Sequence, residues 1–368
     1  MTRFSRRVAG IEVSGIRKWF EGAGAGAINL GLGQPDLDTP AHIKAAACRA
    51  IGEGRTGYTP NGGIPELQEA IAAKSRRENN LEYGPGQVIV TAGASEALHL
   101  AMQALVDDGD RVLVADPGFV SYAALALIAG GRPEGLPLDE RFHLDIEAAK
   151  ERMDGAKVLV LNSPANPTGA VEPADSVRAL AEYADDAGVT IVSDEVYEHF
   201  VYDGARMTSP GRFAGNVVTV NATSKTYAMT GWRLGWLAGP DEVVAQAVKV
   251  HQYCQACATS ISQYAALEAL NGPQDCVRAM RDEYAARRTL LCDGLSALGI
   301  DVPRPEGAFY LFPPMDDDLV RRIIAAGVTI VPGEAFGPAG AGHARIAYSA
   351  SRDDLVTALE RIGGIIND

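Results

Sequence analysis

The sequence is poor in lysine, in cysteine and in long apolar runs, and each shortage narrows what the protein can be. Only seven of its 33 basic residues are lysines, so each lysine is a candidate for a specific task. No uncharged stretch reaches the roughly 18 residues that a membrane-spanning helix needs, so we expect no membrane partner. Five cysteines, an odd number, with no apolar signal sequence near the start, favour reduced thiols and a cytoplasmic location.

Positive charge is also in deficit, since 33 Lys and Arg against 47 Asp and Glu give a net charge of −14. An acidic surface repels a phosphate backbone, so we expect no nucleic-acid partner. Hydrophobic residues make up 47% and charged residues 22% of the 368 residues, which excludes a disordered or collagen-like chain. At roughly 150 residues per domain, the length allows two or three domains.

The middle of the chain alternates short apolar runs with polar loops and helical stretches. The runs that we interpret as strands are residues 88–90, 112–115, 158–161, 189–193 and 217–220. Helical spacing is found between them, for example at residues 95–106 and 174–187. This alternation predicts an α/β fold with a mostly parallel sheet, helices on both faces and right-handed crossovers.

The C-terminal part has a different pattern, which predicts a smaller α+β unit. The expected helices are residues 273–298, 317–326 and 352–362, and the expected strands are residues 309–312, 328–331 and 344–348. We predict that residues 1–37 form an N-terminal segment packing on this small domain. Residues 38–275 would then form a large domain, and residues 276–368 the small C-terminal domain.

Functional side chains follow the predicted strands at their carboxyl ends, where ligands bind in open parallel sheets. Residues 91–97 form a small-residue turn that opens a helix, and its free N–H groups and dipole suit a phosphate. The other strands are followed by Phe119, Asn166, Asp194, Tyr197, Lys225 and Arg233. Each has an ordinary structural explanation, such as a turn, a helix cap or a surface charge. Only their combination at one sheet edge is specific.

This combination matches the needs of pyridoxal phosphate (PLP), which requires an amine, an acid beside its ring nitrogen and anchors for its oxygens. Lys225 supplies the amine if its pKa is lowered, and Asp194 pairs with the pyridinium. We predict Lys225, Asp194 and Tyr197 as the catalytic residues. The other predicted cofactor contacts are Tyr197 and Asn166 at the ring oxygen, Phe119 on the ring face, and Gly93, Ala94, Ser95, Ser224 and Arg233 at the phosphate.

Seven motifs carry a resemblance to a known family. They are residues 33–36, 58–63, 166–169, 194–197, 224–233, 305–310 and 344–346, and they span nearly the whole chain. In content and order the chain resembles the class I/II PLP-dependent aminotransferases of fold type I, in the aspartate aminotransferase superfamily, and looks most like the archaeal-type aspartate aminotransferases. The resemblance implies a large domain with a mostly parallel seven-stranded sheet sandwiched by helices, and a smaller α+β domain built from both chain ends.

The resemblance also implies further roles. Arg345 matches the arginine that binds the substrate α-carboxylate, a task that suits its fork of donors, and Gly33 and Asn166 would lie nearby. Tyr58 matches a tyrosine that reaches the cofactor phosphate of the other subunit, which implies a homodimer with shared active sites. The implied reaction is ping-pong transamination through a Schiff base, with Lys225 as general acid and base. It would move an amino group from an L-amino acid, first choice aspartate, to a 2-oxo acid such as 2-oxoglutarate.

The residues that bind the substrate side chain stay open. Many aspartate-specific relatives have a basic residue where this chain has Ser95, and some have a serine where it has Ala222. Arg17 is a candidate cation for a second carboxylate, and equally a surface arginine. Alanine, aromatic amino acids and 2-aminoadipate therefore remain possible donors.

Other classes of protein are alternatives. A PLP-dependent carbon–sulfur lyase or decarboxylase would keep the fold and the cofactor. A cofactor-sensing regulator would need a DNA-binding domain, for which too few residues precede Ile28, and a nicotinamide dehydrogenase rests only on the Gly/Ala stretch at residues 22–27. Cys254 and Cys257 have the spacing of a metal or redox pair. Without a second pair we expect no metal there, but small buried residues of a helix.

Overall fold

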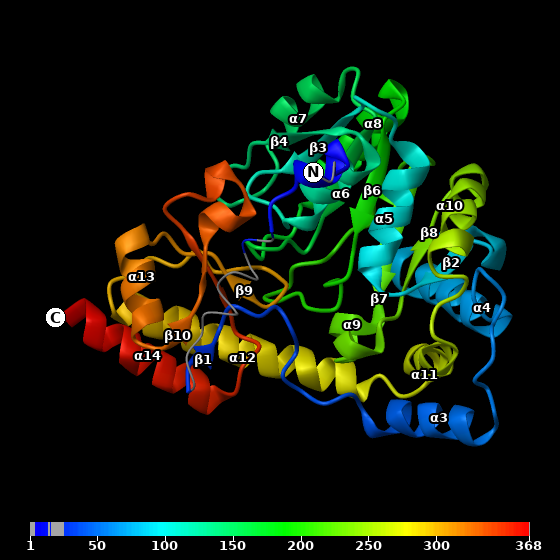
Figure 1. Cartoon of the computed structure of the whole chain (residues 1–368). Coiled ribbons are helices and arrows are strands. Elements are labelled where there is room, and N and C mark those ends of the chain that lie inside the picture. The colour runs from blue at the N-terminus through cyan, green and yellow to red at the C-terminus, as the bar shows by residue number, and fades with distance from the viewer. Residues whose placement is uncertain (1–3, 14, 16–25, 368) are drawn as a thin grey trace.

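The computed structural model describes residues 4–13, 15 and 26–367 (Figure 1). Its centre is a seven-stranded sheet with the order β2-β8-β7-β6-β5-β3-β4. Among the described strands of this sheet, only β8 runs in the direction opposite to the others, so the predicted mostly parallel sheet is confirmed. The strands are β2 (Val88–Thr91), β3 (Arg111–Ala115), β4 (Arg132–Leu136), β5 (Val158–Asn162), β6 (Thr190–Asp194), β7 (Val217–Ala222) and β8 (Gly235–Ala238).

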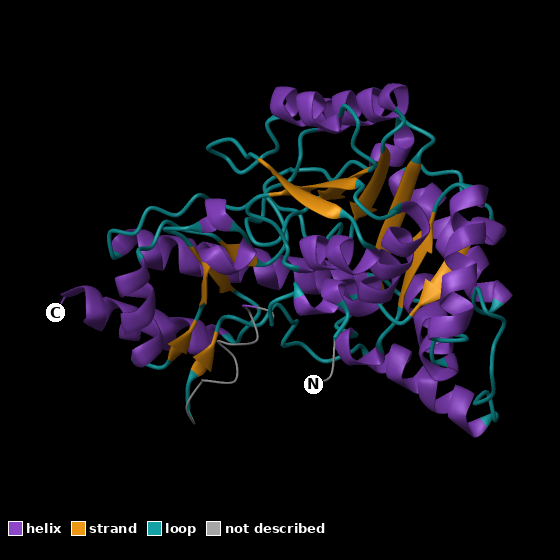
Figure 2. Ribbon diagram, turned by 45° about the horizontal axis from the view of Figure 1, so that its top comes forward, coloured by secondary structure: helices purple, strands orange, loops and turns teal. Residues whose placement is uncertain are grey.

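Helices cover both faces of the sheet (Figure 2). On one face lie α5 (Ala94–Leu105), α6 (Ser121–Ala129) and α10 (Asp241–Cys254). On the other face lie α7 (Ile146–Met153) and α8 (Ala174–Ala187), joined at the β2–β8 end by α3 (Ala41–Gly52), α4 (Pro65–Lys74) and α11 (Ser260–Asn271). Val88 and Ile89 pack into opposite cores because successive side chains of a strand point to opposite faces.

The second unit is built from both ends of the chain. The strands β11 (Val331–Pro332), β12 (Ala344–Ala347) and β9 (Tyr310–Leu311) form an antiparallel three-stranded sheet. The N-terminal strand β1 (Ile28–Asn29) pairs with β10 (Val328–Thr329), as Figure 1 shows. One hydrophobic core joins Ile28 and Leu30 to the C-terminal helices α12 (Asp275–Ala297), α13 (Asp317–Ala325) and α14 (Arg352–Asn367).

The division into domains at residues 37 and 275 stays a prediction. It is supported by the separate cores around the large sheet and around α12–α14. Within the N-terminal segment, β1 joins the small unit, whereas α1 (Arg6–Ala9) contacts α6 beside the large sheet. No helix in the described part of the chain is both long and apolar enough to cross a membrane.

Short helical turns connect the main elements and shape the loops. They are the π-helix η1 (Ser75–Asn79), the 3₁₀ turns η2 (Pro85–Gln87), η3 (Pro210–Arg212), η4 (Thr230–Trp232), η5 (Gly333–Phe336) and η6 (Pro338–Gly340), and the one-turn helix α9 (Thr223–Thr226). The helix α9 directly follows β7 and carries Lys225, so the sheet places this lysine at its carboxyl edge.

Some expectations about single elements are wrong. The strand expected at residues 328–331 is two strands, β10 and β11, which pair with different partners. Cys254 is the last residue of α10 and is exposed, not buried within a helix. The helix cannot continue to Cys257 because Ala256 has a left-handed φ of 62°.

Candidate active site

A cavity of about 270 Å³ opens where the carboxyl ends of β5, β6 and β7 meet the small unit. The large sheet contributes its strand ends, α5 contributes its N-terminus, and the chain ends contribute residues 32–33 and β12. The predicted site residues that line the cavity are Gly33, Ala94, Ser95, Phe119, Asn166, Asp194, Tyr197, Ser224, Lys225, Arg233 and Arg345. The fold therefore brings together most of the side chains that the sequence selects.

Lys225 lines this cavity and is only partly exposed to solvent. Its Nζ donates a hydrogen bond to the Gly33 carbonyl oxygen at 2.6 Å, and it lies 5.9 Å from the ring centre of Tyr197. Burial lowers the pKa of Lys225 to about 8, and the positive charge of Arg345 acts in the same direction. A lowered pKa leaves part of the lysine as neutral amine near neutral pH, which is the nucleophilic form.

Asp194 ends β6 and is buried. Its Oδ2 accepts a hydrogen bond from the Tyr122 hydroxyl at 2.9 Å. Burial raises the pKa of Asp194 to about 6, while the Tyr122 hydrogen bond and the Lys225 charge oppose this rise. A buried carboxylate at neutral pH is stabilised by a cationic partner, and a protonated pyridine nitrogen is such a partner.

Arg345 presents an almost fully buried guanidinium, with 2% of the residue exposed. Its Nη1 donates to Asn166 Oδ1 at 2.9 Å, and its Nη2 donates to the Gly31 carbonyl oxygen at 2.6 Å. Among the described residues, Arg345 Nε has no hydrogen-bond partner. Both acceptor oxygens are neutral, so they do not balance the positive charge of the Arg345 guanidinium. The site therefore suits the carboxylate of a bound substrate.

The aromatic wall of the cavity ties the large sheet to the small unit. The hydroxyls of Tyr197 and Tyr310 are 2.7 Å apart, and the Arg345 guanidinium lies 4.6 Å from the Tyr310 ring centre. A Cβ at Gly33 would lie only 2.1 Å from the Tyr310 hydroxyl oxygen. Glycine at position 33 is therefore required for this close approach.

The N-terminus of α5 has the features of a phosphate cradle. The amide of Gly93 donates to Thr91 O, and the amide of Ala92 donates to the Glu96 carboxylate. No described residue accepts a hydrogen bond from the amides of Ala94 and Ser95, which leaves them free for an anion. Arg233 extends this end of the cavity, where its Nη2 donates to Ala92 O at 3.3 Å. A Cβ at Gly93, which has φ +83°, would lie 2.8 Å from that nitrogen.

Three predicted or candidate residues lie elsewhere. Gly93 does not line the cavity, and Tyr58 is 92% exposed and does not line it either. Arg17 falls outside the described residues. The basic residues that line the cavity, within the described part of the chain, are Lys225, Arg233 and Arg345. None is left over for a second substrate carboxylate once the amine, the phosphate and the α-carboxylate are assigned.

Sequence reasoning missed three residues that support the site. Tyr122 holds Asp194, Tyr310 contacts Tyr197, and Asn162 donates from Nδ2 to the Asp194 carbonyl while its Oδ1 accepts from Asn166 N. Tyr122 lies three residues after Phe119, a helical spacing that could have indicated a shared face. Tyr310 lies within the motif at residues 305–310, but nothing local connects it to Tyr197.

The residues present fit pyridoxal phosphate. The amine of Lys225, the buried carboxylate of Asp194 and the free amides at the α5 N-terminus beside Arg233 suit its aldehyde, ring nitrogen and phosphate. The unpaired Nε of Arg345 corresponds to a substrate carboxylate.

Comparison with known proteins gives concordant matches. The family model for aminotransferase class I and II matches residues 25–362. A probable aspartate aminotransferase of Methanocaldococcus jannaschii is 44% identical over 99% of both chains. An aspartate/prephenate aminotransferase of Thermus thermophilus is also 44% identical, over 93% of this chain and 92% of its own. The solved structure of the Thermus thermophilus aspartate aminotransferase with maleate has a TM-score of 0.94 at 41% identity, covering 99% of this chain and 100% of its own.

The depressed pKa of Lys225 predicts how the protein without cofactor captures PLP. The capture rate should rise with pH with a midpoint at about 8 and level off at higher pH, because the neutral amine is the reactive form. Stopped-flow absorbance across the pH range measures it. Arg345→Gln should move the midpoint upward, since the Arg345 charge lowers this pKa. A midpoint near about 10.4, the value of a free lysine, would contradict the assignment.

Proposed function

The chain belongs to the class I and II aminotransferase family, and from this premise we propose that it moves the amino group of L-aspartate to 2-oxoglutarate. It is an enzyme of the transaminase class. The single observation that carries the proposal is the Lys225 amine, with its lowered pKa, in one cavity with Asp194 and Arg345. We also propose a cytoplasmic location, which the five free cysteines support.

Each residue has one proposed task. Bound PLP supplies an electron sink for negative charge at the substrate Cα. Lys225 holds the cofactor in the resting enzyme and then, as a free amine, moves the proton at the substrate Cα. Asp194 keeps the ring nitrogen protonated, and Tyr122 keeps Asp194 oriented. Arg345 binds the α-carboxylate, and Asn166 fixes the guanidinium through its side-chain oxygen.

Aspartate is the first choice of donor because relatives across the full chain are named for it. A second candidate is a donor with an apolar or aromatic side chain. It is favoured by the cavity itself, in which the described basic residues are already assigned and Leu32, Leu98 and Val196 contribute apolar surface. Assaying twenty amino acids with 2-oxoglutarate separates the two, since the first predicts a dominant rate with aspartate.

We further propose a homodimer in which Tyr58 of one subunit reaches the cofactor phosphate bound by the other. Tyr58 is 92% exposed, and its loop lies beside the loop after α10, where Asn61 donates to Ala256 O. An open groove runs from Gln34 and Trp232 to Arg233 at the phosphate end of the cavity. A second subunit covering this groove would bring an exposed tyrosine to the phosphate.

Replacing Lys225 tests the reaction. Lys225→Ala should abolish formation of glutamate from aspartate and 2-oxoglutarate, measured by a coupled assay, while the circular dichroism spectrum stays unchanged. Borohydride treatment should attach PLP covalently to the wild type and not to the variant. Retained turnover would refute the role of the lysine. Ammonia and pyruvate without a new amino acid would favour the lyase alternative.

Replacing Arg345 tests substrate binding. Arg345→Ala should weaken amino-acid binding by about 2–5 kcal/mol, because a carboxylate in a desolvated site loses its charged partner. Binding of PLP should change far less, since Lys225, Asp194 and Arg233 remain. Titration of each ligand by absorbance gives both values. An unchanged amino-acid affinity would reject the assignment.

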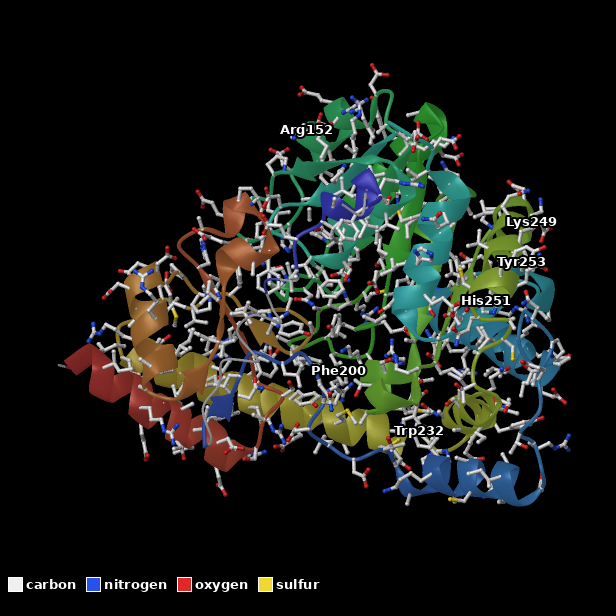
Figure 3. The ribbon with its side chains drawn as sticks, in the orientation of Figure 1. Arg152, Phe200, Trp232, Lys249, His251 and Tyr253 are labelled. Carbon is white, nitrogen blue, oxygen red and sulfur yellow. The ribbon has the colours of Figure 1, made fainter. Side chains whose placement is uncertain are left out.

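Replacing Tyr58 tests the shared site. Sedimentation should give the mass of a dimer, and Tyr58→Phe should weaken PLP binding by about 1.5–3 kcal/mol, the worth of a hydrogen bond to a charged group. Tyr253→Phe is a matched control, because Tyr253 is also exposed, at 87%, and lies on α10 (Figure 3). A monomer, or equal effects of the two variants, would argue against the proposal.

A further inference from the structure

A cluster of seven polar side chains, four of them buried, lies next to the segments that line the cavity, although none of its members lines the cavity itself. We name it the rear cluster, and its members are Lys74, Glu78, Asn79, Glu195, Glu198, His199 and Asn221. Lys74 is only 3% exposed. Its Nζ contacts the Glu198 carboxylate, donates to Asn79 Oδ1 at 2.7 Å and lies 3.6 Å from Glu78 Oε2.

The rear cluster is formed where α4 passes into the π-helix η1. Lys74 is the last residue of α4, and Glu78 and Asn79 belong to η1. A π-helical turn is rare and is frequently found at functional sites. Here it places Asn79 so that its Nδ2 donates to Glu198 Oε2 at 2.7 Å. The turn therefore adds a second contact to the carboxylate that Lys74 already holds.

Two consecutive residues of the cluster contact the chain on both sides of Lys225. Before the lysine, Asn221 Nδ2 donates a hydrogen bond to Glu198 Oε1 at 2.6 Å. His199 Nδ1 lies 3.1 Å from Thr226 Oγ1, the residue after the lysine. The lysine is thus bracketed by contacts to Glu198 and His199.

The other two predicted catalytic residues precede Glu198 and His199 in the sequence. Asp194, at the end of β6, and Tyr197 line the cavity, whereas Glu198 and His199 belong to the rear cluster. The placement of Lys225 relative to Asp194 and Tyr197 therefore depends on contacts made outside the cavity.

Lys74 is the counter-ion of this cluster. Burial opposes ionisation of Glu198, but the Lys74 charge holds its pKa below the usual value. Burial and the neighbouring Glu198 charge instead raise the pKa of Glu195 to about 7. Ligand atoms of Glu78, Glu198 and His199 lie within 4.8 Å of one another, as in a metal site. The Lys74 ammonium already lies against both carboxylates, so it fills the place that a cation would take.

We propose that Lys74 is a positioning residue for the reaction: its ion pair with Glu198 fixes the segment that bears Lys225 against the loop that bears Asp194 and Tyr197. This inference rests on the proposed role of Lys225. Neither residue of the pair lines the cavity. Loss of the pair should therefore change the geometry of the lysine while the cofactor and substrate contacts remain.

Three variants of the full enzyme test it. Lys74→Met removes the cation and leaves a buried carboxylate unpaired, which threatens folding. Lys74→Met/Glu198→Met removes both charges and the Asn221 contact, and so avoids an unpaired charge. Thr226→Val removes only the hydroxyl that contacts His199. Lys249→Met is the control, since Lys249 lies on α10 (Figure 3) and its contact, Gln246, is not a member of the cluster.

The double variant should keep the wild-type KM and lose about 10-fold or more in kcat, because a small misplacement of a reacting group is costly. The pH midpoint of absorbance of the lysine-bound cofactor should also move, which a purely structural role would not require. Thr226→Val should shift both values in the same direction, and Lys249→Met should shift neither.

The inference would be overturned if both the double variant and Thr226→Val kept the kcat and the pH midpoint of the wild type. This failure is distinct from failure of the proposed function. In the latter case the wild type itself would neither form glutamate nor attach PLP upon borohydride treatment.

Discussion

The desolvation of one amine is the constraint on which the site depends. Desolvation, Arg345 and Arg233 disfavour the charge of Lys225 and Asp194 favours it, and the desolvation outweighs the carboxylate. Asp194 is buried as well, and a buried carboxylate at neutral pH is stabilised by a cationic partner such as a protonated pyridine nitrogen. Tyr122 and Asn162, which hold Asp194 from two sides, are therefore as much a part of the site as the charged groups.

The cavity is completed by segments from distant parts of the chain. The large sheet supplies the amine, the acid and the phosphate cradle, while the chain ends supply Gly33 and Arg345. Hydrogen bonds connect these parts directly, among them those from Lys225 to Gly33 O, from Arg345 to Asn166, and between Tyr197 and Tyr310. Cofactor binding and substrate binding are thus assigned to different units that meet at one wall.

Much of the fold and the site could be predicted from the sequence, because strand-end residues in a parallel sheet converge at one edge whatever the details of packing. The helix α8 has the predicted bounds, and the five predicted strands are present. The strand β4 escaped notice since its sequence, Arg-Pro-Glu-Gly-Leu, has no apolar run; as an edge strand it tolerates proline. The contacts of Tyr122 with Asp194 and of Tyr310 with Tyr197 were not predicted. They join residues 72 and 113 positions apart in the sequence, and no local pattern encodes such separations. The rear cluster is of the same kind: Lys74 and Glu198 are 124 positions apart.

The pairing of β1 with β10, together with the Arg345 contact to Gly31 O, has a consequence for biosynthesis. During translation, β1 cannot pair until β10, which lies near the opposite end of the polypeptide, has been synthesised. Domains fold as they emerge from the ribosome, N-terminal parts first. The α5 N-terminus and Lys225 are therefore synthesised, and can begin to fold, before Arg345 exists, so the proposed cofactor contacts precede the proposed substrate contact.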